Sequence, residues 1–379
     1  MNFTYTEDQL AIKDVADKIF RNMAADDQIK VCFSEDKPFH KALWKTLGES
    51  GLIAATLPAE VGGSEMGMTE LSLIIEGQGA SVAPIPFIET VVECAMPIAQ
   101  FASTELQQRV LSSVSAGDAV LSAVRPYDGL QDLQPLTVKA DGENWVLNGV
   151  SALVSYAPLA NGFLVVAHND AEKGGTFWVG YCDANISGLS QVKQNSTTSE
   201  AVAQLTFDNV VVAASDVIAV DEKANELIEW QAQRTYAAIA SQQIGVLKDG
   251  LRRAAEYTTE RKQFGRPLSK FQAVAQQAAD AYMAIEALRG VCWRALDDID
   301  SGRDAALSAR VAKFWVCEAG HIAGHIFLHI HGGIGQDLDY PLHRYFTWAK
   351  RNENYLGASI KQSVALGELI KADPEKVAI

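Results

Sequence analysis

The chain has 379 residues, with 32 lysines and arginines against 47 aspartates and glutamates, so its formal net charge is −15. Apolar residues make up 48% of it and charged residues 21%, which is typical of a globular protein and not of a disordered or fibrous one. This length accommodates about two or three domains. The acidic balance argues against binding to nucleic acid or an anionic membrane, because both need a basic protein surface.

The sequence indicates neither a leader peptide nor a membrane span. The first ten residues, MNFTYTEDQL, are acidic and lack the apolar core of a secretory signal. No apolar run approaches the about 20 residues that cross a bilayer. Five scattered cysteines, none of them spaced C-x-x-C, argue against a disulfide framework and a zinc site. We therefore expect a protein of the reducing cytoplasm without a metal site.

Residues 1–117 have the pattern of a helical domain. Thr6-Glu7-Asp8-Gln9 matches a capping box, and apolar residues repeat at helical spacing after it. A second helix is expected from Phe39 to Gly48, with Leu43, Trp44 and Leu47 on one face. The loop LPAEVGGSEM follows, and further helices are expected after it.

Residues 118–220 change to the alternating pattern of strands, with turn residues at short intervals. Asp141-Gly142 and Asn148-Gly149 are turn signals between candidate strands. No helical pattern of 10–15 residues separates these strands, so we expect an antiparallel sheet, closed as a barrel or packed as a sandwich, and not a Rossmann unit.

Residues 221–379 are helical again, in long amphipathic segments. The expected helices are 223–258, 271–299, 304–331 and 355–372, and they suggest a four-helix bundle. The chain is therefore expected to be mainly α-helical with a central antiparallel β domain.

The segment ERKQFGRPLS, between the first two of these long helices, has a composition suited to binding phosphate. Arg261, Lys262 and Arg266 place three cations within six residues, beside an aromatic side chain and a turn glycine. The planar guanidinium group suits phosphate oxygens. The alternative is a solvated helix end whose cations complement the helix dipole.

The segment HIHGGIG, at the end of a later helix, places three glycines within four residues. Glycine allows another group to approach the backbone closely, although such a cluster also simply ends many helices. Five of the seven histidines lie in or near this segment, and His321, His325 and His329 share one helical face. No carboxylate at matching spacing completes a metal site, so we expect buried or interface histidines.

Together these two segments resemble a known family. The order of helices, sheet and bundle, with E-R-x-x-F-G opening one bundle helix and H-G-G-x-G ending a later one, is similar to that of the acyl-CoA dehydrogenases. LPAEVGGSEM resembles the P-E-x-x-G-G loop of that family, and DYPLHRYFTWAK resembles its Y-P-x-x-R segment. The resemblance covers nearly the whole chain.

The resemblance implies that FAD binds between a sheet domain and a bundle, with its adenine end reaching a neighbouring subunit. Arg261 and Gln263 then match residues that hold the pyrophosphate. Phe264 matches the adjoining aromatic residue, and Gln272 matches a polar residue that faces the adenine end. Two glycines let the dinucleotide lie against the backbone, beside a histidine where many relatives have glutamine. The implied residues are Arg261, Gln263, Phe264, Gln272, Gly332, Gly333 and His329.

The implied reaction is α,β-desaturation of an acyl-CoA thioester. A carboxylate of raised pKa takes the α-proton, and the β-hydrogen leaves as hydride to the flavin. Leu356 stands where relatives most often have the catalytic glutamate, and Thr235 stands at the alternative position on the first bundle helix. Neither is a base. The nearest carboxylates are Glu229, Glu226 and Glu353, of which Glu229 is the first candidate for a relocated base.

The sheet segment also departs from the family. AVRPYDGLQD replaces the loop that lies over the flavin and the CoA chain in relatives. Leu153-Val154-Ser155 stands where relatives have a tryptophan and a hydroxyl residue at the flavin wall. Ser155 keeps a hydroxyl that could reach the edge of the flavin ring at N5, but the tryptophan is absent.

With these residues lost and with the sequence pattern HIHGGIG…DYPLHRYF, the chain resembles the small subunits of paired acyl-CoA dehydrogenases. Those enzymes act on bulky or dicarboxylic thioesters, such as those of steroid side chains. The first hypothesis is therefore a subunit of a dimer or tetramer that a paralogous chain completes, with electron-transfer flavoprotein as acceptor. The second is a self-sufficient dehydrogenase with a relocated base. The third is a non-catalytic interaction protein that keeps only the scaffold.

Overall fold

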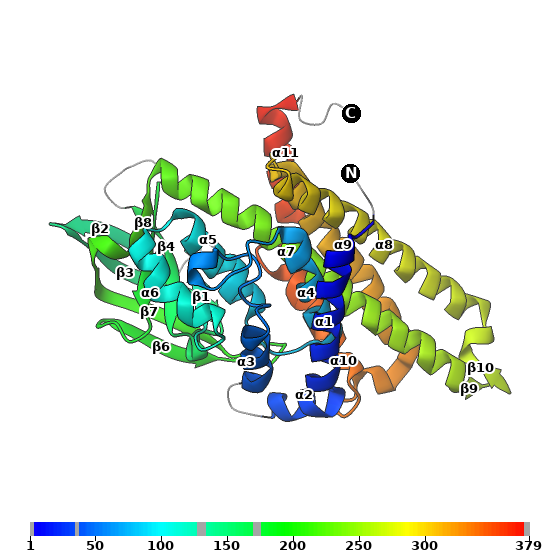
Figure 1. The fold of residues 1–379 in the computed structure, drawn as a ribbon. Helices are drawn as coiled ribbons and strands as arrows, with labels where there is room; N and C mark the ends of the chain where they lie inside the picture. Colours follow the sequence, from blue (N-terminus) through cyan, green and yellow to red (C-terminus); the bar gives the residue numbers. More distant parts are fainter. Residues whose placement is uncertain (1–3, 35–37, 127–133, 170–175, 375–379) are drawn as a thin grey trace. The chain divides into compact units, whose positions relative to one another are not determined.

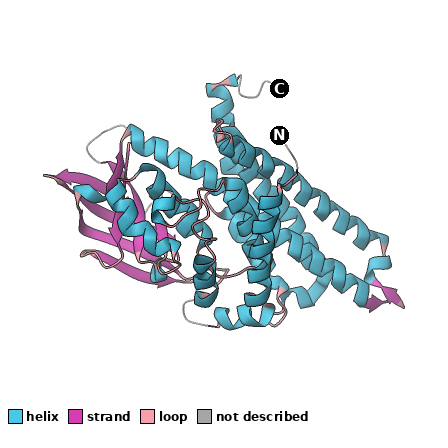
Figure 2. Ribbon diagram, in the orientation of Figure 1, coloured by secondary structure: helices cyan, strands magenta, loops and turns pink. Residues whose placement is uncertain are grey.

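The computed structural model describes residues 4–34, 38–126, 134–169 and 176–374. The contacts between residues group the chain into two compact units. One unit contains Met1–Ile29, Met68–Ala83 and Tyr236–Ile379, and the other contains Lys30–Gly67 and Pro84–Thr235. Each unit is described by itself. Figure 2 shows the helices in cyan and, in magenta, the strands of one large sheet and of a short two-stranded hairpin.

The first unit is helical and begins with α1 (Glu7–Met23). The predicted capping box is confirmed: the Gln9 backbone N–H donates to Thr6 Oγ1 at 3.2 Å, and the Thr6 N–H donates to Gln9 Oε1 at 3.0 Å. Helix α4 (Met68–Ser81) packs against α1. A Cβ at Gly77 would lie 2.8 Å from the Phe20 ring, so the glycine makes room for that ring.

Four further helices and the part of α7 from Tyr236 onward complete this unit, and in Figure 1 they run from green to red. Helix α9 packs against α8, α10 and α11, and a Cβ at Gly245 would lie 2.1 Å from the Glu76 carbonyl oxygen, so α7 and α4 are in backbone contact. The buried Gln243 amide donates at 3.3 Å to carbonyls of α9 and α10. The helices are α7 (Glu222–Glu260), α8 (Gln272–Asp300), α9 (Ala306–His331), α10 (Leu342–Asn354) and α11 (Ser359–Ala372).

The last quarter of the chain differs in detail from the prediction. The HGGIGQDLDYP segment, expected to be a loop, contains the short helix η6 (Gly332–Gln336), and the residues after it, for which no helix was predicted, form α10. Its buried residues Tyr345, Trp348 and Asn352 recur at helical spacing. The expected helix at 355–372 begins only at Ser359, because Leu356 and Gly357 have positive φ angles of 58° and 103° and end α10.

A carboxylate from a distant helix caps α4. The Met68 and Thr69 backbone N–H groups donate to the two carboxylate oxygens of Asp300 at 2.7 Å and 2.9 Å, and Thr69 Oγ1 donates at 2.5 Å. These N–H groups have no partner inside the helix, so the last residue of α8 supplies what an N-cap side chain would otherwise provide.

The second unit contains the remaining N-terminal helices and the sheet. Helix α3 (Lys41–Glu49) buries Leu43, Trp44 and Leu47, as the sequence predicted. The π-helix η2 (Ile88–Ala95) is entirely buried. The other elements are the end of α2 (Asp26–Phe33), η1 (Ala59–Val61), α5 (Met96–Phe101) and α6 (Thr104–Ser115).

One eight-stranded sheet follows, in the order β6-β7-β3-β2-β4-β5-β8, with β1 paired to β4. Its buried core includes Trp178, Phe163 and Leu205. Short helices η3 (Ala157–Leu159) and η4 (Ala214–Asp216) connect strands. The strands are β1 (Leu121–Val124), β2 (Thr137–Asp141), β3 (Asn144–Ser155), β4 (Gly162–Asn169), β5 (Phe177–Asp183), β6 (Leu189–Gln194), β7 (Val202–Val212) and β8 (Val217–Val220).

Most strand pairs are antiparallel as predicted, but β4 pairs in parallel with β1 and with β2. A parallel pair needs a long crossover connection, which is usually a helix. Here β2 and β3 themselves form the connection from β1 to β4. The absence of an intervening helical pattern therefore did not exclude parallel pairing.

The secondary structure changes near the predicted boundaries: α6 ends at Ser115 and β1 begins at Leu121, while β8 ends at Val220 and α7 begins at Glu222. The division into domains 1–117, 118–220 and 221–379 remains a prediction, because the contacts group residues into two units. Among the described residues, no helix is long and apolar enough to cross a bilayer.

We predict that Asp300→Ala lowers the free energy of unfolding by about 1 kcal/mol, because the first turn of α4 loses its cap. Chemical denaturation of the purified chain measures this change. Asp280→Ala, an exposed substitution on the same helix, is the matched control and is expected to change stability little. Equal effects of the two variants would contradict the capping role.

Candidate functional site

The predicted phosphate-binding segment forms a hairpin at the end of α7. Strands β9 (Lys262–Gln263) and β10 (Arg266–Pro267) pair around Phe264 and Gly265, whose φ angles are 51° and 79°. Two successive positive φ angles are typical of the tightest hairpin turns. Figure 1 shows the hairpin beyond the end of α7 and before the start of α8.

The hairpin presents its functional groups to solvent. Phe264 is 92% exposed, and the side chains of Arg261 and Lys262 form no hydrogen bond or ion pair with the part of the chain that the structure describes. Arg266 instead lies over the Phe271 ring, with its guanidinium carbon 4.1 Å from the ring centroid. Two cations therefore remain available to an anionic group.

Gln272 is the first residue of α8, and Phe271 occupies the N-cap position without a side-chain hydrogen bond to the first turn. The backbone N–H groups of a helix start favour negative charge. Gln272 thus lies at an uncapped helix start directly after the basic hairpin.

The end of α9 carries the glycine turn. Gly332 has φ 64° and ψ −146°, a conformation that is essentially restricted to glycine. A Cβ on Gly332 or on Gly333 would meet no heavy atom of the described residues within 4 Å. The backbone requires glycine at 332, whereas neither backbone strain nor packing within this chain requires it at 333. The exposed surface of the turn is open to an approaching group.

Two contacts bring these segments to one end of the bundle. The His329 ring Nδ1 lies 3.2 Å from Gln277 Oε1, which joins the end of α9 to the first turns of α8. The His331 ring stacks on Tyr257 near the end of α7, with a centroid distance of 4.6 Å. Seven of the predicted cofactor residues therefore belong to this bundle end: Arg261, Gln263, Phe264, Gln272, His329, Gly332 and Gly333.

The eighth, Ser155, is the last residue of β3 and belongs to the other unit. Its carbonyl oxygen accepts a 2.5 Å hydrogen bond from Ser122 Oγ. Leu153, where relatives have the wall tryptophan, is 58% exposed. Most of the AVRPYDGLQD segment, from Tyr127 onward, lies outside the described residues.

The two positions at which the resemblance implies a base carry no carboxylate. Thr235 is completely buried, and its hydroxyl donates at 2.9 Å to the Gln231 carbonyl within the same helix. Leu356 lies in the turn after α10, where its carbonyl accepts a 3.2 Å hydrogen bond from the Gln362 amide. Both positions are fixed by the local backbone and neither offers a carboxylate.

The nearby carboxylates have surface or structural partners. Glu353 forms an ion pair with Lys350 at 2.7 Å and lies 3.8 Å from the His321 ring. Glu229 Oε1 accepts from the Gln233 amide at 3.4 Å within one turn of α7. Glu226 is exposed. A carboxylate enclosed in an apolar pocket, as proton abstraction needs, is not found among these three.

A buried charged cluster was missed from the sequence. In η2, Glu93 is only 1% exposed, and its Oε1 lies 3.3 Å from the Arg125 guanidinium. Arg125 also donates to Gln231 Oε1 at 3.0 Å, and the Gln231 amide donates to the Glu93 carbonyl. Gln231 lies one turn before Thr235 on α7. A lone arginine in a loop and a glutamate in an apolar helix gave no periodic signal of this contact.

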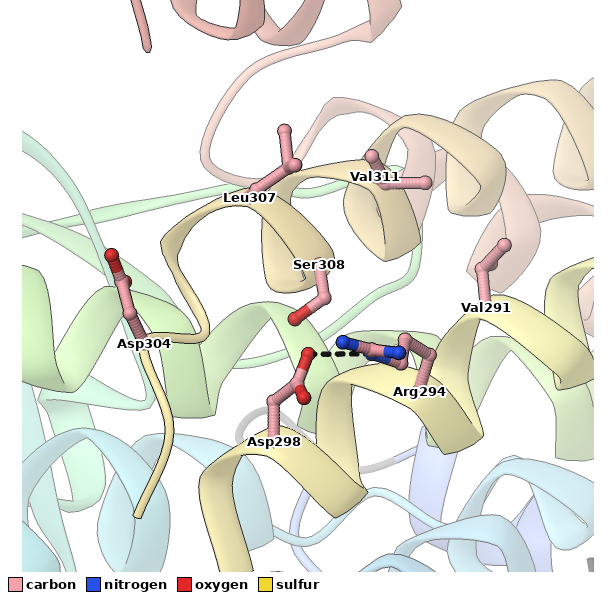
Figure 3. A pocket seen from close by; sticks show the side chains of 7 residues that line it. All are labelled: Val291, Arg294, Asp298, Asp304, Leu307, Ser308 and Val311. Carbon is pink, nitrogen blue, oxygen red and sulfur yellow. Dashed lines mark hydrogen bonds and ion pairs between the residues drawn. The ribbon is translucent and has the colours of Figure 1, made fainter. Parts of the chain in front are cut away.

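A cavity of about 410 Å³ lies between the end of α8 and the start of α9, as Figure 3 shows. Arg294 Nε donates to Asp298 at 2.9 Å. Burial raises the pKa of the Asp298 carboxyl, but hydrogen bonds from Arg294 and Arg303 outweigh burial and keep it below its ordinary value. None of the predicted site residues lines this cavity: its lining is Val291, Arg294, Asp298, Asp304, Leu307, Ser308 and Val311.

The expected histidines are divided between core and surface. His331 is buried, whereas His321, His325 and His329 are exposed along α9, and the first two stack at a centroid distance of 4.5 Å. Within the described residues, no three His, Cys, Asp or Glu side chains gather in a group that could hold a metal ion.

Comparisons with known proteins decide the family. The sequence profile of the acyl-CoA dehydrogenase N-terminal domain matches residues 6–118, and that of the acyl-CoA dehydrogenase C-terminal domain matches residues 225–363. The chain belongs to the acyl-CoA dehydrogenase family. Members of this family are flavoprotein oxidoreductases that act on CH–CH groups, and FAD is their cofactor.

Three relatives match over nearly their whole length. Acyl-CoA dehydrogenase FadE27 of Mycobacterium tuberculosis is 31% identical over 99% of this chain and 100% of its own. A chain of the ChsE4–ChsE5 complex of the same organism is 30% identical, with a TM-score of 0.91 over 98% of this chain and 99% of its own. A steroid ACAD variant named Tcur3481–Tcur3483 is 33% identical, with a TM-score of 0.89 over 97% and 99%.

We predict that Arg125→Met lowers the free energy of unfolding by about 3 kcal/mol, because it leaves the Glu93 carboxylate buried without its cation. The double variant Glu93→Leu/Arg125→Met is expected to recover most of this loss, since it removes both charges. Denaturant unfolding of both variants measures the difference. A double variant no more stable than Arg125→Met would show that the two side chains are not coupled.

Proposed function

We propose that this chain is the subunit of a paired, FAD-dependent acyl-CoA dehydrogenase that helps to hold the cofactor but lacks the catalytic base. One observation carries the proposal. The bundle end offers exposed cations and an open glycine backbone, while both family positions for the base are occupied by Thr235 and Leu356. The features for dinucleotide binding are therefore present without those for proton abstraction.

The residues at the bundle end fit the nucleotide half of FAD. Arg261 and Lys262 are free to pair with pyrophosphate oxygens. The planar guanidinium group of Arg261 suits phosphate oxygens in particular. Gln272 lies at an uncapped helix start, and Gly333 leaves room that no group of its own chain fills. Gln263 and His329 are polar groups beside this surface, and Phe264 offers an exposed ring.

The family reaction divides between the chains under this proposal. When bound, FAD supplies the hydride acceptor. This chain orients the cofactor through its basic hairpin and its glycine turn. The proton acceptor for the acyl α-carbon comes from the partner, because Thr235 is committed to an internal hydrogen bond and Leu356 carries no titratable group.

The named relatives support a paired assembly. The ChsE4–ChsE5 protein is a complex of two different chains, and the Tcur3481–Tcur3483 protein is described as a steroid ACAD. We therefore propose a paralogous acyl-CoA dehydrogenase chain as the partner and a bulky acyl-CoA, such as a steroid side-chain thioester, as the substrate. Electron-transfer flavoprotein as acceptor and a cytoplasmic location are part of the same proposal.

Two alternatives make different predictions. A self-sufficient dehydrogenase would need a relocated base, with Glu229 as first candidate. A non-catalytic interaction protein would bind no FAD. Arg261 and Lys262 argue against the latter, because their side chains have no hydrogen-bond or ion-pair partner among the described residues.

We expect the chain alone to purify with little FAD, and the chain co-expressed with the paralogue encoded beside it to purify with bound FAD and dehydrogenase activity. Arg261→Ala is expected to lower the FAD content of that complex several-fold, since it removes one charge-assisted hydrogen-bond donor. Lys223→Ala, at the opposite end of α7, is the control. Flavin absorbance measures the content. A fully active homo-oligomer of this chain would overturn the proposal.

Glu229→Gln separates the proposed subunit from a self-sufficient enzyme. If the base belongs to the partner, the variant complex should bleach its flavin with the acyl-CoA substrate at an unchanged rate. Stopped-flow absorbance measures that rate. Abolished bleaching would instead assign proton abstraction to Glu229 of this chain.

A further inference from the structure

His331 occupies a buried position at the bundle end, between α7 and the loop before α10. It is 3% exposed and is the last residue of α9, directly before the glycine turn. Its ring stacks on Tyr257 of α7 at an interplanar angle of 19° and lies 5.4 Å from the Tyr340 ring. One imidazole therefore contacts α7 and the loop before α10 at once.

The hydrogen bonds of His331 define the tautomer of its neutral ring. Nδ1 lies 2.8 Å from the Phe327 carbonyl oxygen, which can only accept, so Nδ1 carries the proton. Nε2 lies 3.1 Å from the Tyr340 hydroxyl and accepts from it when the ring is neutral. A proton on Nε2 would turn this acceptor into a donor and require the Tyr340 hydroxyl to reverse its hydrogen bond.

The surroundings of the ring disfavour a positive charge. Burial is the largest cause that lowers the pKa of His331, the Phe327 carbonyl opposes it, and Arg253 of α7 lowers it further. Arg253 is paired with Asp26 at 2.7 Å and with Asp249 at 2.6 Å. The other titratable groups that face the ring are Tyr257 of α7 and Tyr340 of the loop.

The glycine turn packs against the Cβ atom of His331. A Cβ at Gly335 would be 3.1 Å from His331 Cβ, so η6 packs directly on this residue. Gly332 and Gly333 begin η6, and their outer face is the open surface described above. A shift of His331 would move this surface relative to the end of α7, which leads into Arg261.

We propose that neutral His331 is the positioning residue that joins the glycine turn to the basic hairpin and thereby sets the affinity of the bundle end for FAD. The inference rests on the proposed function, because it assumes that FAD binds there. The contacts that carry it are the Tyr257 stack, the bond to Phe327 and the hydroxyl of Tyr340, all within one unit of the chain.

This role gives FAD binding a defined pH dependence. In the folded chain the pKa of His331 is lowered, so the neutral ring and its contribution to stability are fully present above the ordinary histidine value of about 6.5. That contribution is lost as the pH falls through the lower folded-state value. FAD affinity should therefore weaken on acidification, and the change should depend on the imidazole.

The experiment measures FAD affinity by fluorescence quenching between about pH 7.5 and pH 5, in the complex of the full chain with its paralogue. The variants are His331→Phe, which keeps an aromatic ring but cannot titrate, and Tyr340→Phe, which removes only the hydroxyl. His325→Gln, an exposed histidine of the same helix, is the control. Because Tyr340→Phe keeps the ring packing, it remains informative even if His331→Phe folds poorly.

Wild type and His325→Gln should lose affinity about tenfold on acidification. His331→Phe should bind several-fold more weakly at neutral pH and lack that pH-dependent loss. Tyr340→Phe should move the midpoint to higher pH, because the neutral ring loses its donor. Identical profiles for wild type and His331→Phe, or an unmoved midpoint in Tyr340→Phe, would overturn the role of His331 alone. A wild-type complex that binds no FAD at any pH would overturn the proposed function as well.

Discussion

The convergence of three helix ends is the constraint on which the candidate site depends. The basic hairpin follows α7, the uncapped helix start belongs to α8, and the glycine turn ends α9. The hairpin and the start of α8 are close in the sequence, whereas the glycine turn follows only after α9, and the packing of the bundle brings it to the same end. The Tyr257–His331 stack and the His329–Gln277 contact join them there. A cofactor surface composed of loops and helix ends is thus held in place by packed helices.

The site combines side chains that are exposed to solvent with a buried side chain that is held by hydrogen bonds. Arg261 and Phe264 face solvent, whereas His331 is enclosed and fully hydrogen-bonded. This arrangement suits a surface that another molecule must cover, because the binding groups can be reached while their backbone is fixed from within. In the other unit the buried Arg125–Glu93 pair lies beside the helix turn of Thr235. A buried ion pair contributes little net stability, so its presence there is better explained by a specific local geometry.

Periodic features of the fold could be predicted from the sequence, and the features that failed depend on contacts between distant residues. The capping box at Thr6, the buried face of α3 and the long bundle helices follow from local chemistry and helical spacing. Helix α10 was missed because a Pro/Gly-rich loop precedes it, and the parallel pairs of β4 were missed because strands form their crossover. The hairpin and the glycine turn were recognisable by composition. The enclosed position of His331 was not, since it depends on contacts with Tyr257 and Tyr340, which lie outside α9.

The two neighbouring glycines at the end of α9 differ in what a mutation would do. Every missense change of a glycine codon introduces a side chain, and at position 332 any side chain is forced into φ 64°, ψ −146°, so each such allele damages folding. At position 333 the same codon changes meet no atom of the chain and leave the backbone unstrained. Alleles of 333 should therefore yield a normally folded polypeptide with a defect only in what it binds. Mutations in two adjacent codons are thus expected to have different effects: loss of folding at position 332 and loss of binding alone at position 333.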